Sequence, residues 1–357
     1  MSSNFLRNIK AQFKSVAQPY VSVKDDVVYW GKKNEFFNYL IDLYTYSSKH
    51  QAIVDGKVLL VAGSVDNKAI ADVRKKMIRD YIIFGGCACK VYQSIDGITQ
   101  RIEYVDYSKL RKNDANRDVV YFADVWVKSD DVFKYINVRD VEVIELPIYR
   151  VNSVHPLSVL LIERQGYNRH YPLPEYVRAL QYIEMDYRVS NYWNNSIRRG
   201  FSASHIIDIV SAGMTEEEKM SIENAIKDLF TGDDAAGTFV LNFLRKGDEA
   251  SNIRKIEQHN LGELFDILNK SIQQEIFISH KVTSPMLFGV RVEGQLGGRN
   301  ELLDAYNLFK SSYVLPTRQA IDDVLQQIVG AYDVKDNDII TQDIIQLKGI
   351  LTIDEIR

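Results

Sequence analysis

An unbroken helical pattern between Pro174 and Gly200 constrains the fold of this 357-residue sequence more than any other feature. Proline is tolerated in the first turn of a helix, and no other helix breaker follows before Gly200. At 1.5 Å per residue such a helix spans roughly 39 Å, which is longer than most globular helices. Its apolar residues lie on more than one face: Tyr176, Leu180, Ile183 and Tyr187 on one, and Tyr182, Val189 and Trp193 on others. A helix of this kind packs on more than one side.

A second long helix is expected from about Asn260, and Thr283-Ser284-Pro285 ends it. The segment between the two long helices carries signals for elements of its own. Thr215 and Glu218 form a capping box for a helix with an acidic first turn. Residues 238–244 and 253–256 have the character of a strand and a return strand joined by a turn. The sequence therefore predicts two long helices around a small α/β insert.

The first half of the chain predicts a separate α+β unit over residues 47 to about 150. Ser47-Ser48 begins a helix that stops at Gly63, and a second helix runs from about Asn67 to Gly85-Gly86. The side chains then alternate from Cys87 to 105, with a tight Asp96-Gly97 turn that is typical of a β-hairpin. Three strand-like runs extend the hairpin to a small antiparallel sheet: 119–127, 133–138 and 141–146.

The last part of the chain begins with a Gly-rich loop, 289–298, and a third long helix is expected from about Asn300. Pro316 lies inside this helix and should kink it. Near the end, Thr352 and Glu355 form another capping box, yet only two residues follow. The final segment therefore resembles the start of an element that the sequence does not complete.

Composition limits the classes of function. The chain carries 44 basic and 48 acidic side chains, a formal net charge of −4, which disfavours tight, sequence-independent binding of nucleic acid. No apolar run approaches the ~20 residues of a membrane-spanning helix. The only two cysteines, Cys87 and Cys89, cannot build a disulfide framework or a four-ligand zinc site. They favour a reducing compartment and a role as small core residues.

The amino terminus carries Arg7, Lys10 and Lys14 among apolar residues, and no acidic residue precedes Asp25. This amphipathic pattern is compatible with a transit peptide or with a helical arm that docks on a neighbour. A continuous apolar core of the kind found in signal peptides is absent, and the helical arm is the favoured interpretation.

No catalytic motif stands out. The six histidines do not fall at the spacing of a helix-borne zinc site, and no nucleophile elbow, dinucleotide fingerprint or P-loop is present. The stretch from Gly289 to Asn300 holds four glycines and two arginines just before a helix, where backbone N–H groups can cradle phosphate. It lacks a Lys-Ser/Thr end, so a flexible connector and a mobile loop that passes along a polyanion are alternatives to a nucleotide site.

A series of short motifs runs through the second half in a fixed order: Leu173-Pro174-Glu175-Tyr176, Asn195 to Gly200, Phe230-Thr231-Gly232, Ala236 to Leu241, His280 to Leu287, and Gly294 to Leu303. In this order they resemble the tailed-bacteriophage portal (head-tail connector) protein family. His50 to Val58 resembles the family more loosely. The resemblance covers about residues 45 to 330, and the order of the motifs is more specific than any one of them.

The resemblance implies a portal fold of the α+β class, with an α/β wing, a two-helix stem, a small α/β clip and a kinked C-terminal helix. The segments that it implies are an N-terminal arm (1–46), the wing (47–172), a stem helix (173–200), the clip (201–259), a second stem helix (260–284), the tunnel loop (285–299), a kinked wing or crown-base helix (300–330) and a short C-terminal segment (331–357). The last segment leaves little room for a helical crown, which is absent or truncated.

The implied function is structural, with no enzyme activity, no cofactor and no metal. Portals form rings, in this case an expected dodecamer, at one capsid vertex of the virion, and they assemble in the cytoplasm of the host bacterium. Double-stranded DNA passes non-specifically through the channel during genome packaging and ejection. The implied partners are the large terminase subunit, a head-tail adaptor protein and the major capsid protein, with no membrane. A near-neutral charge suits a conduit that DNA must traverse without sticking.

The resemblance also implies site residues, none of them catalytic. The tunnel loop facing DNA would comprise Arg291, Glu293, Gly294, Gln295, Leu296, Gly297, Gly298 and Arg299. Docking of terminase or adaptor on the clip would use Glu216, Glu217, Glu218, Asp233 and Asp234. Channel-facing candidates on the stem are Arg198, Arg199 and Lys270. Two alternative functions remain open: a nucleotide-binding enzyme that uses the loop 289–298, and a non-portal connector ring protein.

Overall fold

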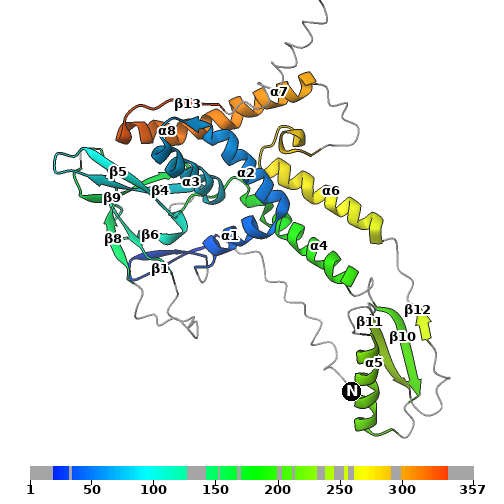
Figure 1. Cartoon of the computed structure of the whole chain (residues 1–357). Helices are drawn as coiled ribbons and strands as arrows, with labels where there is room; N and C mark the ends of the chain where they lie inside the picture. Colours follow the sequence, from blue (N-terminus) through cyan, green and yellow to red (C-terminus); the bar gives the residue numbers. More distant parts are fainter. Residues whose placement is uncertain are drawn as a thin grey trace, which may run out of the picture. The chain divides into compact units, whose positions relative to one another are not determined.

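The computed structural model describes residues 19–31, 34–126, 142–151, 153–166, 170–198, 203–210, 214–230, 238–244, 253–255, 261–290 and 299–336. The chain divides into two units: Met1–Ile183 with Gln274–Arg357 (unit 1), and Glu184–Gln273 (unit 2). Helices and strands are mixed along the chain, which confirms the α+β class (Figure 1). Within the described ranges, no helix has the length and apolar character to cross a membrane.

Helices α2 (Ser48–Ala62) and α3 (Lys68–Phe84) form where local sequence signals place them. The side chains of Ser47 and Asn67 accept hydrogen bonds from backbone N–H groups in the first turns. Gly63 (φ 55°) and Gly85 (φ 83°) end the helices in conformations that a Cβ disfavours. The two helices pack together, and α3 also packs on β4 (Figure 1).

Residues 21–46, assigned by sequence to an arm, form β1 (Val21–Lys24), β2 (Val27–Trp30) and α1 (Phe36–Tyr46). Trp30, Phe36 and Phe37 of this stretch lie in the core of unit 1. Trp30 is fully buried and stacks on Tyr171 with 5.1 Å between ring centroids. This stretch is therefore an integral part of unit 1.

The predicted hairpin is confirmed. Strand β4 (Gly86–Gln93) pairs antiparallel with β5 (Thr99–Val105), and Gly97 in the turn has φ 78°. On its other edge β4 pairs antiparallel with β9 (Leu157–Glu163), which makes β4 the central strand. Cys87 and Cys89 are both fully buried on β4, as expected of small core residues.

A second sheet of unit 1 has the strand order β1-β2-β6-β7-β8 and is antiparallel throughout. A 3₁₀ turn (Tyr107–Lys109) leads into β6 (Leu110–Asn113), which is followed by β7 (Val119–Phe122) and β8 (Ile144–Pro147). The predicted strand at 133–138 lies outside the described residues.

Helix α4 (Leu180–Arg198) begins several residues later than Pro174 predicts. A 3₁₀ turn (Val177–Ala179) precedes it. The hydroxyl of Tyr176 donates to the carbonyl of Ile83 at 2.7 Å, which fixes the chain before the helix. This tertiary contact overrides the local start signal.

The helix after the Gly-rich loop is interrupted as Pro316 predicts, but the interruption is a change of helix type. Helix α7 (Arg299–Phe309) continues through a π-helix, η6 (Lys310–Val314), into α8 (Leu315–Val329). The N–H of Leu315 donates to the carbonyl of Lys310, five residues earlier. Pro316 has no N–H to donate to the carbonyl four residues earlier in an α-helix. The local change to hydrogen bonds spanning five residues accommodates this missing donor. Beyond α8, β13 (Val334–Lys335) pairs with β3 (Ser64–Val65).

Unit 2 holds the predicted insert, with one correction to its strand pairing. The order is β10 (Ala203–Val210), α5 (Glu216–Phe230), β11 (Thr238–Leu244) and β12 (Ile253–Lys255). Strand β10 pairs parallel with β11 and antiparallel with β12. The return strand therefore pairs with β10 and not with β11, because the unpredicted β10 occupies the centre of the sheet. Helix α6 (Leu261–Ser279) follows close to its predicted start, and a 3₁₀ turn (Pro285–Phe288) comes after it.

Candidate functional site

The acidic triplet Glu216-Glu217-Glu218 forms the exposed first turn of α5. The Glu218 carboxylate accepts from the N–H of Thr215 at 2.8 Å, and the Thr215 hydroxyl accepts from the N–H of Glu218 at 3.3 Å. Glu216 lies 2.6 Å from the Lys219 ammonium. Two of the three acids therefore have partners within the helix, and Glu217 is the one most available to another protein. Asp233 and Asp234 lie outside the described residues.

The expected DNA-facing residues are only partly described. Residues 291–298 lie outside the described ranges, and Arg299 is the first residue of α7. The chain enters this loop from Gly289, whose φ of 77° ends a 3₁₀ turn. Of the stem candidates, Arg198 is the last residue of α4, Lys270 is exposed on α6, and Arg199 is not described.

Helices α4 and α6 expose apolar side chains within unit 2. Trp193 and Phe265 pack edge to face, with 4.5 Å between ring centroids. By contrast, Tyr192 is 56% exposed and Ile267 is 60% exposed, and Tyr187 and Leu268 are also exposed. Apolar surface gathered on two helices is typical of a surface that another chain covers.

A buried polar cluster lies in unit 1 and joins segments far apart in sequence. The fully buried Lys57 ammonium forms an ion pair with Glu175 and donates to the carbonyl of His280 at 2.6 Å. Its nitrogen lies 3.9 Å from the ring centroid of Tyr313. Glu175 also contacts Arg164 at 3.3 Å. Burial lowers the pKa of Lys57 to about 8, although Glu175 opposes this shift.

Sequence reasoning missed this cluster, although its residues lie in the quoted motifs. Lys57 and His50 belong to the motif from His50 to Val58, Glu175 to the Leu-Pro-Glu-Tyr motif, and His280 to the motif that it begins. The order of these motifs gives no sign of contact, because His50 and His280 are 230 residues apart. Three short motifs of the resemblance thus meet in the interior of unit 1.

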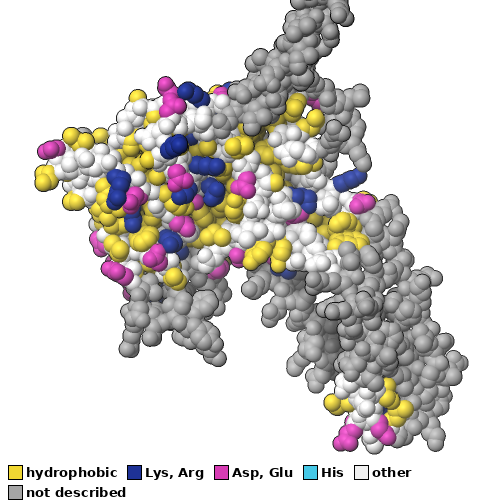
Figure 2. Space-filling view, in the orientation of Figure 1, with side chains coloured by type: hydrophobic (Ala, Val, Ile, Leu, Met, Phe, Trp, Pro, Cys, Tyr) yellow, Lys and Arg dark blue, Asp and Glu magenta, His cyan; other side chains and the backbone are white. Residues whose placement is uncertain are grey.

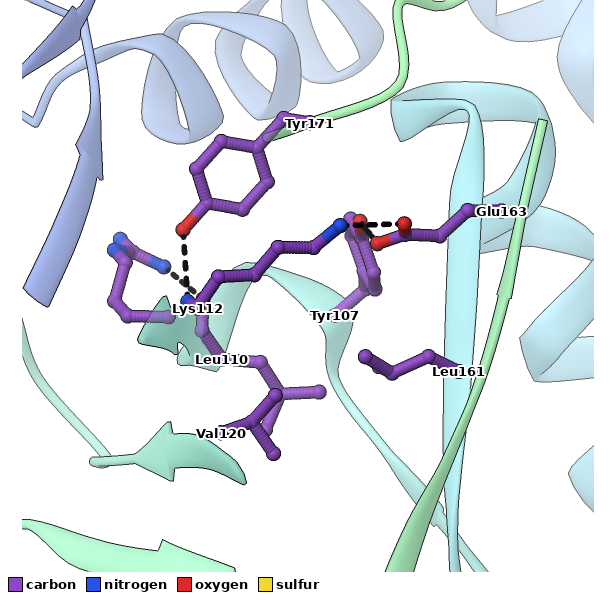
Figure 3. Close-up of a pocket in the computed structure, with 8 residues that line it drawn as sticks. Tyr107, Leu110, Lys112, Val120, Leu161, Glu163 and Tyr171 are labelled. Atoms are coloured by element: carbon purple, nitrogen blue, oxygen red, sulfur yellow. Dashed lines mark hydrogen bonds and ion pairs between the residues drawn. The ribbon is translucent and has the colours of Figure 1, made fainter. Parts of the chain in front are cut away.

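A second set of polar contacts lines a small pocket between β6 and β9 (Figure 3). The Glu163 carboxylate accepts from the Tyr107 hydroxyl and from the Lys112 ammonium. The Tyr171 hydroxyl accepts from the N–H of Lys112 at 3.2 Å and donates to the carbonyl of Val28 at 2.7 Å. The polar groups that line the pocket form hydrogen bonds with other protein groups. We therefore interpret the pocket as part of the core and not as a ligand site.

Two further observations concern metal ligands and surface charge. Within the described ranges, no three His, Cys, Asp or Glu side chains gather closely enough to hold a metal ion. On the face of unit 1 visible in Figure 2, Lys and Arg side chains are interspersed with Asp and Glu. This face therefore has the mixed charge that the near-neutral composition suggests.

Comparisons with known proteins identify the fold. No protein-family model matches the sequence, and no curated protein matches it. A chain of the native gene transfer agent virion matches with a TM-score of 0.51 and 13% identity, over 88% of both chains. A chain of the native particle's neck, with C12 symmetry, matches with a TM-score of 0.52 and 13% identity, over 88% of this chain and 89% of that one.

A third solved structure is an HK97 family phage portal protein from Corynebacterium diphtheriae. It matches with a TM-score of 0.48 and 10% identity, over 81% of this chain and 90% of that chain. The matches to the virion and neck chains extend over 88% and 89% of those chains. The chain therefore shares the fold of the matched chains of the gene transfer agent particle.

Proposed function

We propose that this chain is a portal protein, the subunit of a ring at one capsid vertex through which the genome is packaged and ejected. The observation that carries the proposal is the fold likeness to a chain of a C12-symmetric particle neck over 88% of this chain. A subunit of a closed ring makes the same heterologous contact with each neighbour. The motif order in the sequence supports the same interpretation.

In this proposal, unit 1 supplies the wing, α4 and α6 the stem, and the β10-α5-β11-β12 insert the clip. The segment 285–299 would be the tunnel loop that passes along DNA. Arg291 and Arg299 would touch phosphates, while the glycines allow the loop to approach the duplex closely. Each Lys or Arg that contacts a phosphate adds a salt-dependent increment to the affinity for DNA. A loop with few such charges therefore lets DNA slide past and does not hold it.

The exposed apolar residues of α4 and α6 support ring formation. Tyr192 and Ile267 would lose their exposed surface to a neighbouring subunit, and burial of apolar area contributes roughly 25 cal/mol per Å². Glu217 on α5 would lie at the clip, where the large terminase subunit and later a head-tail adaptor dock. The major capsid protein would contact the ring at the vertex.

Electron microscopy of the purified full-length chain tests the proposal directly. End-on views should show rings, and their rotational symmetry gives the number of subunits. A chain that stays monomeric over a wide concentration range would contradict the portal assignment. Removing residues 291–298 provides a second arm: rings should form as before, while particles made with this variant should package or retain less DNA.

A further inference from the structure

Two histidines meet in the interior of unit 1, and neither belongs to the surfaces of the proposed function. Nδ1 of His50, on α2, lies 2.8 Å from Nε2 of His280, the residue after α6. Both side chains are fully buried. The Tyr176 ring packs against both imidazoles, with centroid separations of 4.4 Å to His50 and 5.0 Å to His280.

The neighbours of the pair determine its tautomers. A hydrogen bond between two neutral imidazoles holds one proton, so one nitrogen donates and the other accepts. Nδ1 of His280 faces the Glu175 carboxylate at 3.9 Å. We therefore assign the hydrogen of His280 to Nδ1, which leaves its Nε2 to accept from Nδ1 of His50. Among the described residues, Nε2 of His50 and Nδ1 of His280 are both buried without a hydrogen-bond partner, since 3.9 Å to Glu175 is beyond hydrogen-bond distance.

This arrangement has no place for an additional proton. A proton on Nε2 of His50 would create a second buried N–H without a hydrogen-bond acceptor, which is costly. The resulting imidazolium would also lie near the Lys57 ammonium. Accordingly, burial and the Lys57 charge lower the pKa of His50 to about 3. Burial, Lys57 and His50 lower the pKa of His280 well below its ordinary value.

We propose that the contact between His50 and His280 is an acid-sensitive joint that holds α2 against the end of α6, and that proton uptake by the two imidazoles opens it. The sign follows from linkage: the opened joint binds protons with ordinary imidazole affinity, while the closed joint excludes them. The closed joint is therefore fully stable above about pH 6.5 and loses stability as the pH falls. The joint operates within the folded chain and does not depend on ring formation.

Other titratable groups around the joint change little between about pH 7.5 and pH 5. Lys57 is mostly charged in the closed joint throughout this range, and, although burial opposes it, the Glu175 charge raises the pKa of Arg164. Tyr81, Tyr176 and Tyr313 keep their protons, because burial raises the pKa of each hydroxyl. Glu175 is the acid of the cluster, and it forms ion pairs with Lys57 and Arg164. The two histidines therefore supply the acid response.

Hydrogen exchange followed by mass spectrometry on the full-length chain measures the opening. With an opened-state pKa of about 6.5, lowering the pH from about 7.5 to about 5 should favour opening by about thirtyfold for each histidine. Protection of peptides from α2 and from 274–282, corrected for intrinsic exchange, should fall accordingly. Peptides from β4 and β9 serve as the internal reference, and their protection should fall less, which separates local opening from global unfolding.

Variants test whether the two imidazoles cause the pH response. A double variant, His50→Leu with His280→Met, keeps apolar volume and removes both titrating groups, so its protection should be independent of pH over this range. His155→Gln, a histidine elsewhere in unit 1, is the matched control and should keep the wild-type response. If the double variant does not fold, the wild-type chain suffices: the logarithm of protection should change with pH with a slope of at least about one below pH 6. A slope near zero in the wild type, or an unchanged response in the folded double variant, would overturn the proposal.

Discussion

Arg74 and Asp322 form a two-point ion pair inside unit 1, although 248 residues separate them. Nε of Arg74 lies 2.6 Å from Oδ1 of Asp322, and Nη2 lies 2.9 Å from Oδ2. The guanidinium also donates to the carbonyls of Val61 and Ala62 at the end of α2. One arginine on α3 thus connects the end of α2 to α8.

Breaking this pair from one side should destabilise the protein strongly. In Arg74→Met, the buried Asp322 carboxylate still accepts from the Tyr332 hydroxyl at 3.0 Å but loses both contacts to the guanidinium. We expect a loss of about 3–5 kcal/mol in the free energy of unfolding, and a smaller loss for the double change Arg74→Met with Asp322→Leu. Denaturant unfolding of the two single variants and the double variant gives the coupling. The exposed pair of Lys76 and Asp72 is the control and should couple by less than about 0.5 kcal/mol.

Asp80 should make stability depend on pH in the direction opposite to the histidine joint. Its carboxylate is buried on α3 and accepts from the Tyr104 hydroxyl and from the N–H of Tyr107, both at 3.0 Å. Burial raises the pKa of Asp80 to about 8. Because the folded state then binds the proton more tightly than the unfolded state, this contribution is present below about pH 4 and is lost as the pH rises to about 8.

Asp80→Asn keeps both acceptor contacts and removes the titration. We expect its free energy of unfolding at pH 8 to exceed that of the wild type by more than about 1 kcal/mol, with the difference shrinking toward pH 4. Urea unfolding of both proteins across this range measures the difference directly. Equal pH profiles for the two proteins would show that folding does not change the pKa of Asp80.

The capping box of α5 can be separated from docking on the acidic turn. Thr215→Ala removes the hydroxyl that accepts from the N–H of Glu218 and should cost about 1 kcal/mol in the stability of unit 2. Glu217→Gln removes an exposed charge, should leave stability within about 0.5 kcal/mol, and should weaken binding of the large terminase subunit in the proposed portal. Thermal unfolding and a pull-down of terminase with each variant distinguish the two effects.

Ring assembly should depend on the apolar residues of α4 and α6 in unit 2. Ile267→Asp places a charge where the proposed neighbour would cover an apolar side chain, and we expect rings to give way to smaller species. Leu308→Asp alters a similarly exposed residue of α7 in unit 1 and is the matched control. Sedimentation and circular dichroism together separate lost assembly from lost folding. If Ile267→Asp still formed intact rings, the contact between subunits would have to lie at other residues.

Gly85 should tolerate no side chain. Its φ is 83°, and a Cβ would lie 2.8 Å from the carbonyl oxygen of Leu173. Gly85→Ala should therefore destabilise unit 1 by about 2 kcal/mol or more. Gly166→Ala meets no atom within 4 Å and is the control, with a change near zero expected. Chemical unfolding of the two variants makes the comparison.

Local elements were largely predictable from the sequence because their signals act over a few residues. The boundaries of α2 and α3, the hairpin around Gly97 and the capping box at Thr215 all follow from side chains next to the backbone groups that they satisfy. Where tertiary contacts compete, prediction was wrong. The late start of α4 is such a case, and so is the pairing of β12 with β10.

Local sequence signals were sufficient to predict the α+β class, most helix ends and the order of the motifs. The expected site residues in the loop 291–298 and at 233–234 remain predictions from that order. The tertiary structure alone decided that His50, Lys57, Glu175 and His280 meet in one buried cluster. Chain separation explains this division: a cap or a turn involves neighbouring residues, whereas a contact across 230 residues depends on how the whole of unit 1 packs.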